Sequence, residues 1–327
     1  MRLINPSFEI LEQAPGEVGI YKQIEKVGRV CWKSESKITE DSYKRFVEML
    51  KSKNHGAVLE HGTVYLYFPT VEGEYYQHSD GTVVMPKDVR KYYTDKYSYC
   101  NYEDEVPEIG FYITTNFRVL VQNNWLDDLK YLCEPTEYHE KRVCVKFIMD
   151  RVGSQSFCRH RVFSFAQEST RYCKYSLDNF GSGITYIIPS YCKLEEGYYG
   201  FENAISTPIC GGEPTVTEGF LYLNHLPTTD EELESAKLIQ NEYTPFIFAL
   251  FKAEQCYFSL MYQGWTPQQA RQVLSNALKT ELVMTGFISD WKHFFSLRDD
   301  KGHAHPDAYA LAHPLHEEFI KRGYLNE

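Results

Sequence analysis

The chemistry of this chain is concentrated in residues 143–176, VCVKFIMDRVGSQSFCRHRVFSFAQESTRYCKYS. The first seven, VCVKFIM, alternate in the manner of a half-buried strand and lead directly into a polar, Arg-rich turn. Residues 158–176 contain four basic side chains and only one acidic side chain, Glu168. Hydroxyl and aromatic side chains are interleaved with them. This combination suits a pocket for an anionic ligand that carries a flat ring.

The whole chain has the opposite charge. Its 327 residues carry a formal net charge of −11, with 43% hydrophobic and 24% charged residues. This balance is typical of a folded globular chain, and the acidic surface argues against nucleic acid or an anionic membrane as partner. An anion site must therefore be a local basic pocket.

The nine cysteines form no C-x-x-C pair, which argues against a zinc ribbon or a thioredoxin-like motif. The first residues, MRLINPSFEILEQ, lack the pattern of a signal peptide, and no apolar stretch is long enough to span a bilayer. We therefore expect reduced thiols and a cytoplasmic protein.

Strand and helix patterns alternate along the chain. Strands are predicted at 62–68, 111–121, 143–149 and 280–285, and helices at 40–53, 229–262, from 266 onward, 289–298 and 306–322. Expected caps are Thr39, the Thr229/Glu232 pair, the Thr266/Gln269 pair and Ser289, with a kink or break at Pro245. Residues 176–228 read as irregular.

This order predicts an α/β fold of the α+β type, with a central, mostly antiparallel sheet flanked by helices. We expect one domain over residues 1–327, in which 69–142 and 187–228 are long insertions.

An Arg-rich run taken alone is more often a solvated turn than a site. The spacing here is more specific. Arg159-His160-Arg161, seven residues, Ser169 and then Arg171 resemble the signature of flavin-dependent thymidylate synthases. The resemblance implies that the Arg-His-Arg segment contacts FAD and that Ser169 and Arg171 hold the substrate dUMP.

Other segments are similar to the same family. His61 and Thr63, before and within the strand at 62–68, resemble its flavin-facing pair, although a His before a strand is more often structural. Arg271 and Arg298 resemble its two distal dUMP arginines. The family places Arg298 at the uracil edge, whereas the helix dipole alone would also favour a cation there.

The resemblance implies a full set of site residues. The catalytic residue is Arg298. The flavin contacts are His61, Thr63, Arg159, His160, Arg161, Gln167, Ser289 and His293. The dUMP contacts are Ser156, Arg159, Gln167, Glu168, Ser169, Arg171, Arg271 and Arg298. The chain departs from the usual pattern where Phe287 and Ser289 replace the Asn and Arg of many members.

The implied reaction converts dUMP to dTMP, with 5,10-methylenetetrahydrofolate as carbon donor, NADPH as reductant and a bound FAD. The implied assembly is a homotetramer. The residues agree with this chemistry, because uracil methylation without a flavin needs an activated Cys beside a base, and no such pair is written here.

Two alternatives remain open. His303, His305, His313 and His316, with Asp307, are candidate ligands of a metal-dependent phosphoester hydrolase. A non-catalytic nucleotide-binding relative is the other alternative. Flavin colour and metal content separate the three.

Overall fold

The computed structural model describes residues 1–69, 76–77, 83–84, 87–102, 110–171, 183–206, 215–223, 237–239 and 242–326. Among these residues, no helix is long and apolar enough to cross a membrane.

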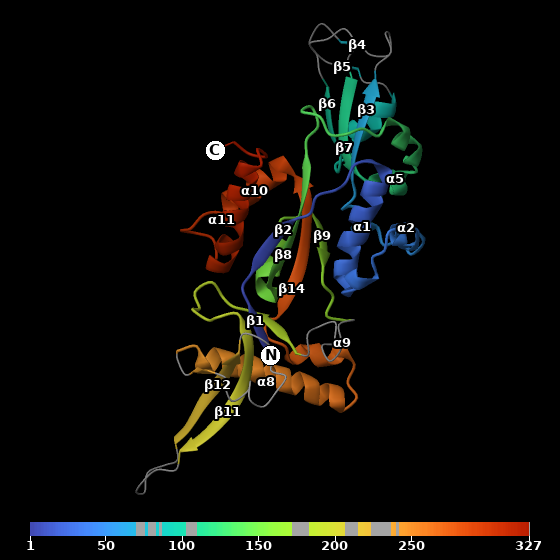
Figure 1. The fold of residues 1–327 in the computed structure, drawn as a ribbon. Coiled ribbons are helices and arrows are strands. Elements are labelled where there is room, and N and C mark those ends of the chain that lie inside the picture. The colour runs from blue at the N-terminus through green and yellow to red at the C-terminus, as the bar shows by residue number, and fades with distance from the viewer. Residues whose placement is uncertain are drawn as a thin grey trace.

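A four-stranded antiparallel sheet occupies the middle of the molecule (Figure 1). Its order is β2 (Ser7–Ile10), β8 (Arg142–Asp150), β14 (Lys279–Phe287) and β9 (Ser164–Gln167). The two long central strands pair along their whole length, from Arg142 opposite Phe287 to Asp150 opposite Lys279. The predicted fold class and the strands predicted at 143–149 and 280–285 are confirmed.

Helices cover both faces of this sheet (Figure 1). The helices α10 (Ile288–Arg298) and α11 (Pro306–Lys321) pack on one face, where Phe147, Trp291 and Leu315 share a core cluster. The helix α1 (Gly16–Trp32) packs on the other, where Val27 meets Val283. Because neighbouring strand residues point to opposite faces, the strands read as nearly continuous apolar runs.

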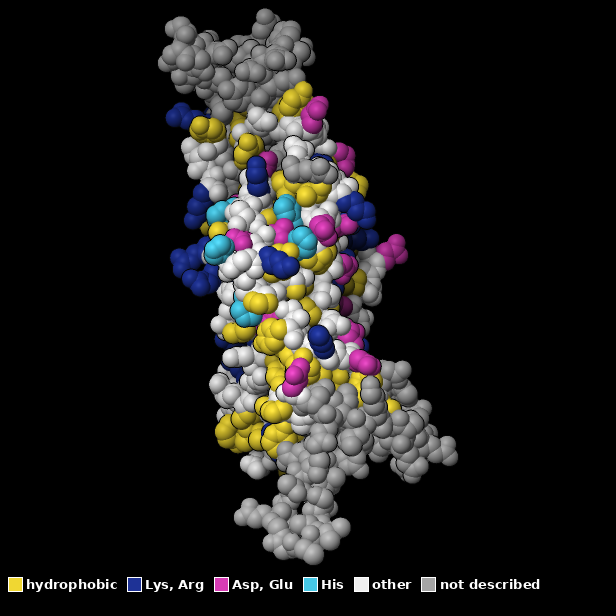
Figure 2. Space-filling view, turned by 90° about the vertical axis from the view of Figure 1, so that its left-hand side faces the viewer, with side chains coloured by type: hydrophobic (Ala, Val, Ile, Leu, Met, Phe, Trp, Pro, Cys, Tyr) yellow, Lys and Arg dark blue, Asp and Glu magenta, His cyan; other side chains and the backbone are white. Residues whose placement is uncertain are grey.

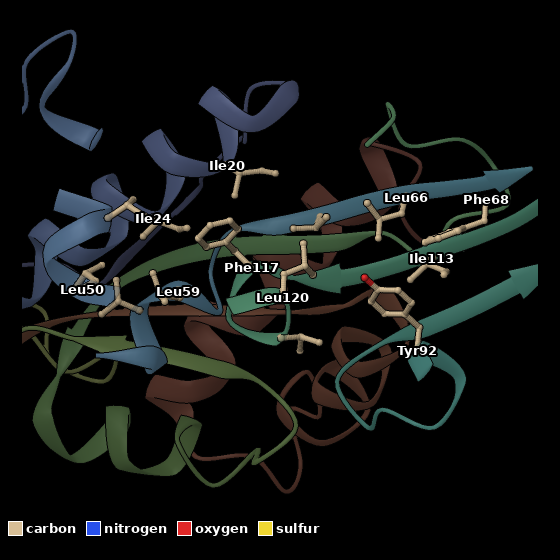
Figure 3. Packing of buried hydrophobic residues seen from close by; sticks show 14 of the residues in the cluster. Ile20, Ile24, Leu50, Leu59, Leu66, Phe68, Tyr92, Ile113, Phe117 and Leu120 are labelled. Carbon is tan, nitrogen blue, oxygen red and sulfur yellow. The ribbon is translucent and has the colours of Figure 1, made fainter. Parts of the chain in front are cut away.

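A second sheet stands at one end of the molecule. It consists of β3 (Thr63–Pro69), β7 (Gly110–Asn116) and β6 (Tyr99–Tyr102), beside a two-stranded ribbon of β4 (Tyr76–Gln77) and β5 (Val83–Val84). The surrounding elements are η1 (Glu35–Lys37), α2 (Ser42–Ser52), α3 (Gly56–Leu59), α4 (Lys87–Tyr93), α5 (Phe117–Asn123) and η2 (Leu126–Tyr131). Ile24, Leu50, Leu66, Tyr92 and Phe117 share one core here (Figure 3), so part of the predicted 69–142 insertion packs against the N-terminal helices.

A third sheet lies at the other end. Its order is β10 (Thr185–Ile187), β1 (Arg2–Ile4), β11 (Gly197–Ser206), β12 (Thr215–Leu223) and β13 (Lys237–Ile239). The helix α8 (Thr244–Tyr262), the short α9 (Pro267–Ala270) and the turn η4 (Arg271–Val273) lie beside it (Figure 1). Residues 176–228 are therefore not simply irregular, because they contribute three strands.

Two predicted elements are wrong in extent. The strand predicted over 111–121 ends at Asn116, whose side chain accepts a hydrogen bond from the Val119 N–H (3.2 Å) and so begins α5. Of the helix predicted over 229–262, Thr244–Tyr262 is helical with Pro245 in its first turn, and residues 229–236 lie outside the described residues. The strand at Lys237–Ile239 interrupts the predicted helix before Pro245, so the predicted break is confirmed. Residues 237–239 form a strand because they pair with β12.

The predicted caps meet mixed outcomes. Residue Thr229 and its partner Glu232 lie outside the described residues. The Thr266/Gln269 capping box is confirmed, but its helix ends at Ala270 and continues only as one 3-10 turn. The N-cap of α2 is Asp41 rather than Thr39, and that of α10 is Phe287 rather than Ser289.

Candidate functional site

The Arg159-His160-Arg161 segment forms the turn between α6 (Arg151–Phe157) and β9. Two backbone hydrogen bonds close this turn, from the His160 N–H to the Phe157 carbonyl (3.0 Å) and from the Phe163 N–H to the His160 carbonyl (3.1 Å). The turn buries His160 and exposes both arginines. The two guanidinium groups are therefore presented outward while the imidazole is held in place.

Arg298, the last residue of α10, binds this turn. Its Nε donates to Nε2 of His160 (2.9 Å), and its Nη2 donates to the carbonyl oxygen of Ser156 (3.0 Å). Burial, together with the charges of Arg298 and His293, lowers the pKa of His160 to about 4. The imidazole is therefore neutral near pH 7 and can accept through Nε2. The ring of His293, which lies earlier on α10, has its centroid 6.5 Å from that of His160.

A second group of predicted residues lies at the opposite end of β9. The Ser169 N–H donates to the Cys31 carbonyl (3.0 Å), and the Arg171 N–H donates to Oγ of Ser169 (3.3 Å). Arg271 reaches the same place from η4, where its Nη1 donates to Oγ1 of Thr170 (2.9 Å). The structure thus brings together three of the residues predicted to contact dUMP, Ser169, Arg171 and Arg271.

Arg151 approaches this group from the other side, and sequence reasoning missed it. Its Nη1 donates to the Glu168 carbonyl and to Oγ1 of Thr280, both at 3.3 Å. Gln167, another predicted contact, donates through Nε2 to Oγ of Ser154 (2.8 Å). Its amide is therefore engaged within the protein.

Glu168 belongs to a buried ion-pair network that was also missed. Lys279 donates to Oε2 of Glu168 (2.9 Å) and to Oε1 of Glu281 (2.5 Å), and Lys33 pairs with Glu281 as well. Burial would raise the pKa of Glu281, but Lys279 and Lys33 outweigh it and lower the pKa to about 2. The Glu168 carboxylate therefore faces these lysines. The sequence signal for this network was the spacing of Lys279 and Glu281, which lie two residues apart and therefore on the same face of β14.

His61 is completely buried. Its Nδ1 lies 2.7 Å from Oγ1 of Thr285, and its Nε2 has no partner among the described residues. Burial and the charge of Arg142 lower the pKa of His61 to about 3, so this imidazole is neutral. Thr63 exchanges two hydrogen bonds of 2.8 Å with the amide of Gln13 through its backbone.

A cavity of about 420 Å³ lies beside the amino end of β9. Its walls include Arg142, Arg161, Ser164 and Phe287. Arg161 is a predicted flavin contact, whereas Arg142 was missed. Ser289 does not line this cavity. Its N–H donates to Oε1 of Glu140 (2.9 Å) at the start of α10.

The predicted site residues thus form two groups separated by β9. We call His160, His293 and Arg298 the turn group, and Ser169 and Arg271 the Ser169 group. The turn group precedes β9 and Ser169 lies two residues beyond its end, so the two groups lie at opposite ends of this strand.

The C-terminal histidines contact three different aspartates. His313 and His316 each contact one oxygen of Asp299, at 2.8 and 2.7 Å. His303 contacts Asp300 (2.8 Å) and His305 contacts Asp307 (3.7 Å). Figure 2 shows the side of the molecule with α10 and α11, where histidine, acidic and basic side chains are interspersed. No group of three or more His, Cys, Asp or Glu side chains in the described part of the chain is arranged to hold a metal ion.

Six of the described cysteines have raised thiol pKa values, which lowers their reactivity. Burial raises the pKa of Cys31 and Cys144 to about 11 and that of Cys100 to about 12. The pKa values of Cys133, Cys158 and Cys192 are raised as well, again mainly by burial. Because the thiolate is the nucleophile, none of these six described cysteines is prepared to attack a substrate.

Two solved structures of the UMP/dUMP methylase PolB from Streptomyces cacaoi, bound with 5-Br dUMP and with 5-Br UMP, are similar to this chain at 15% and 14% identity. The matches cover 98% of this chain and 93% and 92% of theirs, with TM-scores of 0.39 and 0.40. No curated protein matches the chain closely enough to count as a relative.

The family model described as thymidylate synthase complementing protein matches residues 142–322, more than half of the chain. This range contains the Arg-His-Arg turn, the Ser169 group and Arg298. The resemblance seen in the sequence is thereby confirmed: the chain belongs to the thymidylate synthase complementing proteins, the flavin-dependent thymidylate synthases.

Proposed function

We propose that this chain methylates dUMP to dTMP, using bound FAD, 5,10-methylenetetrahydrofolate as carbon donor and NADPH as reductant. Family membership supports a thymidylate synthase-type methyltransferase. The observation that carries the finer proposal is the hydrogen bond from Arg298 to His160. It joins the predicted uracil-binding arginine to a predicted flavin contact that lies 138 residues away in the chain.

The residues around the turn fit a flavin. Arg159 and Arg161 are exposed cations of the turn, Arg161 lines a cavity of about 420 Å³, and Arg142 has a buried Nε without a partner among the described residues. These groups would hold the negatively charged part of FAD, with His160 beside them. When bound, the flavin supplies hydride chemistry at the uracil ring. The raised thiol pKa values favour this route over attack by a cysteine. His61, Thr63, Gln167, Ser289 and His293 remain proposed contacts.

The chain's own residues have distinct tasks toward dUMP. Ser169, Arg171 and Arg271 would bind the phosphate, and Arg298 would meet the uracil edge. Neutral His160 accepts from Nε of Arg298, which fixes the plane of the guanidinium. Nη1 of Arg298 makes no hydrogen bond within the described residues and can donate to a uracil oxygen on which charge develops. Ser156, Arg159, Gln167 and Glu168 complete the proposed substrate contacts.

We also propose, from the family resemblance, that a complete dUMP site is built from more than one copy of the chain. A homotetramer is the assembly that we propose, without nucleic acid or a membrane as partner. We treat residues 1–327 as one domain, with insertions at 69–142 and 187–228.

The absorbance spectrum of the purified protein tests the proposal. We expect a yellow protein that holds FAD with micromolar or better affinity, about −8 kcal/mol. The dUMP-dependent formation of dTMP, in the presence of NADPH and the folate, is the second readout. A colourless protein that contains metal would favour the hydrolase instead. A yellow protein that makes no dTMP would favour a non-catalytic relative.

A double variant tests the site. His160→Ala with Arg161→Ala should lose FAD, because it removes a cation and the imidazole that holds Arg298. Lys292→Gln is the matched control, because Lys292 is exposed on α10 and does not line the cavity. Full flavin occupancy in the double variant would contradict the assignment of this turn.

A further inference from the structure

Arg142 carries a charge that no described carboxylate neutralises by an ion pair. The first residue of β8, it donates through Nη1 to the Glu60 carbonyl (3.0 Å) and to Oγ1 of Thr63 (3.4 Å), and through Nη2 to Oγ of Ser164 (3.3 Å). Each of these acceptors is neutral. The Nε atom is buried and has no partner among the described residues.

Two acids that act on Arg142, Glu60 and Asp290, line the same cavity and are both engaged by other groups. Glu60 forms its ion pair with Arg118, which lies outside the cavity. Asp290 accepts the Phe287 N–H through Oδ2 (3.0 Å) and so caps α10. Both carboxylates act on Arg142 only at longer range. The described protein therefore leaves a half-buried cation, with a fully buried Nε, incompletely compensated.

Such a cation is unfavourable for folding alone. Burial lowers the pKa of Arg142, which reports the same cost of desolvating its charge. An apolar side chain of similar size would fill this position without that cost. A buried donor without a partner is thus more readily explained by a ligand than by packing.

The cavity identifies the chemistry of that ligand. Arg142 lines the space of about 420 Å³ together with the exposed cations Lys96 and Arg161. Phe163 and Phe287 supply apolar walls, and the guanidinium of Arg142 stands 5.6 Å from the Phe287 ring centroid. These three cations outnumber the two acids in the same lining, Glu60 and Asp290, and together with the aromatic rings they suit an anionic group attached to a flat ring.

We propose that Arg142 is the anchor for the diphosphate of a bound dinucleotide, with FAD as that dinucleotide. The choice of FAD rests on the proposed function. A guanidinium matches phosphate oxygens with several donors at once, and the free Nε gives Arg142 a donor for this purpose. Arg161 provides a second cation at the same cavity.

Binding measurements with probes of different phosphate content test this role. FAD, riboflavin, NADPH and inorganic diphosphate are titrated into the ligand-free full chain, its Arg142→Met variant and the Lys292→Gln control. We expect Arg142→Met to weaken FAD binding at least 10-fold, while riboflavin binding changes less than 3-fold. The control, which loses the same charge from an exposed site, should bind all four probes like the parent.

The melting temperature of the ligand-free variant is a second, independent readout. If Arg142 is kept for a ligand, ligand-free Arg142→Met melts at or above the temperature of the parent, because an uncompensated buried charge is gone. If Arg142 is structural, the variant melts lower and loses FAD and riboflavin equally. That result, or an unchanged FAD affinity, would overturn the inference.

The probes also separate this inference from the proposed function. A parent that binds FAD, with a variant that binds it equally well, refutes only the role of Arg142. A parent that binds no flavin, but binds inorganic diphosphate through Arg142, refutes the flavin proposal and supports the anchor. A loss confined to NADPH leaves the FAD affinity unchanged and therefore overturns the assignment of Arg142 to the diphosphate of FAD.

Discussion

Arg298→Lys asks whether the guanidinium acts on uracil or only ends α10. Lysine keeps a positive charge at the C-terminus of the helix, where the dipole contributes about 0.3–1 kcal/mol. It loses the planar fork that now reaches Nε2 of His160 (2.9 Å) and the Ser156 carbonyl (3.0 Å) at the same time. The variant therefore changes geometry while it preserves charge.

The structure sets the size of the expected stability change. One hydrogen bond of the pair can survive in the variant, and the other contributes about 0.5–1.5 kcal/mol. A loss of roughly 1 kcal/mol shifts the melting temperature of a chain of this size by a few degrees. The effect on catalysis should be far larger. Removal of one preorganised donor to a developing charge lowers the rate roughly 10²-fold or more.

The assay measures three quantities on one sample: the melting temperature, the flavin content and the dTMP yield in a single turnover. We expect a small melting shift, retained flavin, normal reduction of the flavin by NADPH, and a yield lowered roughly 10²-fold. Arg322→Lys is the matched control, because Arg322 ends α11 and pairs with Glu318 on the surface.

Two results would refute this reasoning. A near-normal dTMP yield would mean that Arg298 is only a helix cap. A variant that loses flavin together with activity would show that Arg298 acts through His160, as a positioning residue for the turn.

The same geometry supports three further predictions. Arg171→Ala should weaken dUMP binding by roughly 2–4 kcal/mol, because a phosphate loses a charged partner, and Ser169→Ala should cost less; equal and negligible effects in a dUMP titration would return both residues to a solvated turn. The pKa of Glu281 falls from an ordinary 4.5 to about 2 in the folded chain, so its contribution to stability is present above pH 4.5 and is lost as the pH falls toward 2. Denaturant unfolding at pH 7 and pH 3 should therefore show a smaller acid-induced loss for Glu281→Gln than for the parent, and an equal loss would exclude this carboxylate as the cause. Cys31→Ala and Cys144→Ala should both keep dTMP formation, since burial raises both thiol pKa values to about 11; a variant that binds FAD and dUMP normally but cannot turn over would reverse the mechanism.

Local patterns predicted the elements around the central sheet. Alternation in VCVKFIM predicts β8, the strand-like run TELVMT predicts β14, and the Thr266/Gln269 pair predicts the start of α9. These signals work because strand alternation and helix capping depend on residues a few positions apart. The Arg-His-Arg spacing likewise places three residues in one turn.

Local patterns failed where a signal was absent or was overridden. The helix α1 was not predicted, and its N-cap, Pro15, offers no side-chain cap. FRVLV at 117–121 reads as a continuing strand, because a short apolar run cannot be assigned by periodicity alone. Residues 237–239 became a strand through their pairing with β12, which lies well before them in the chain.

The sequence by itself determined the chemistry of this chain: the residue types of the anion site, the family and the order of the main strands. Only the tertiary structure decided which of these residues meet. It joins Arg298 to His160, turns Glu168 toward Lys279, and leaves Nε of Arg142 without a partner among the described residues. The reason is physical. Spacing along a strand or helix fixes only the face on which a side chain lies, whereas burial, pKa and available donors depend on segments that packing brings together from more than a hundred residues apart.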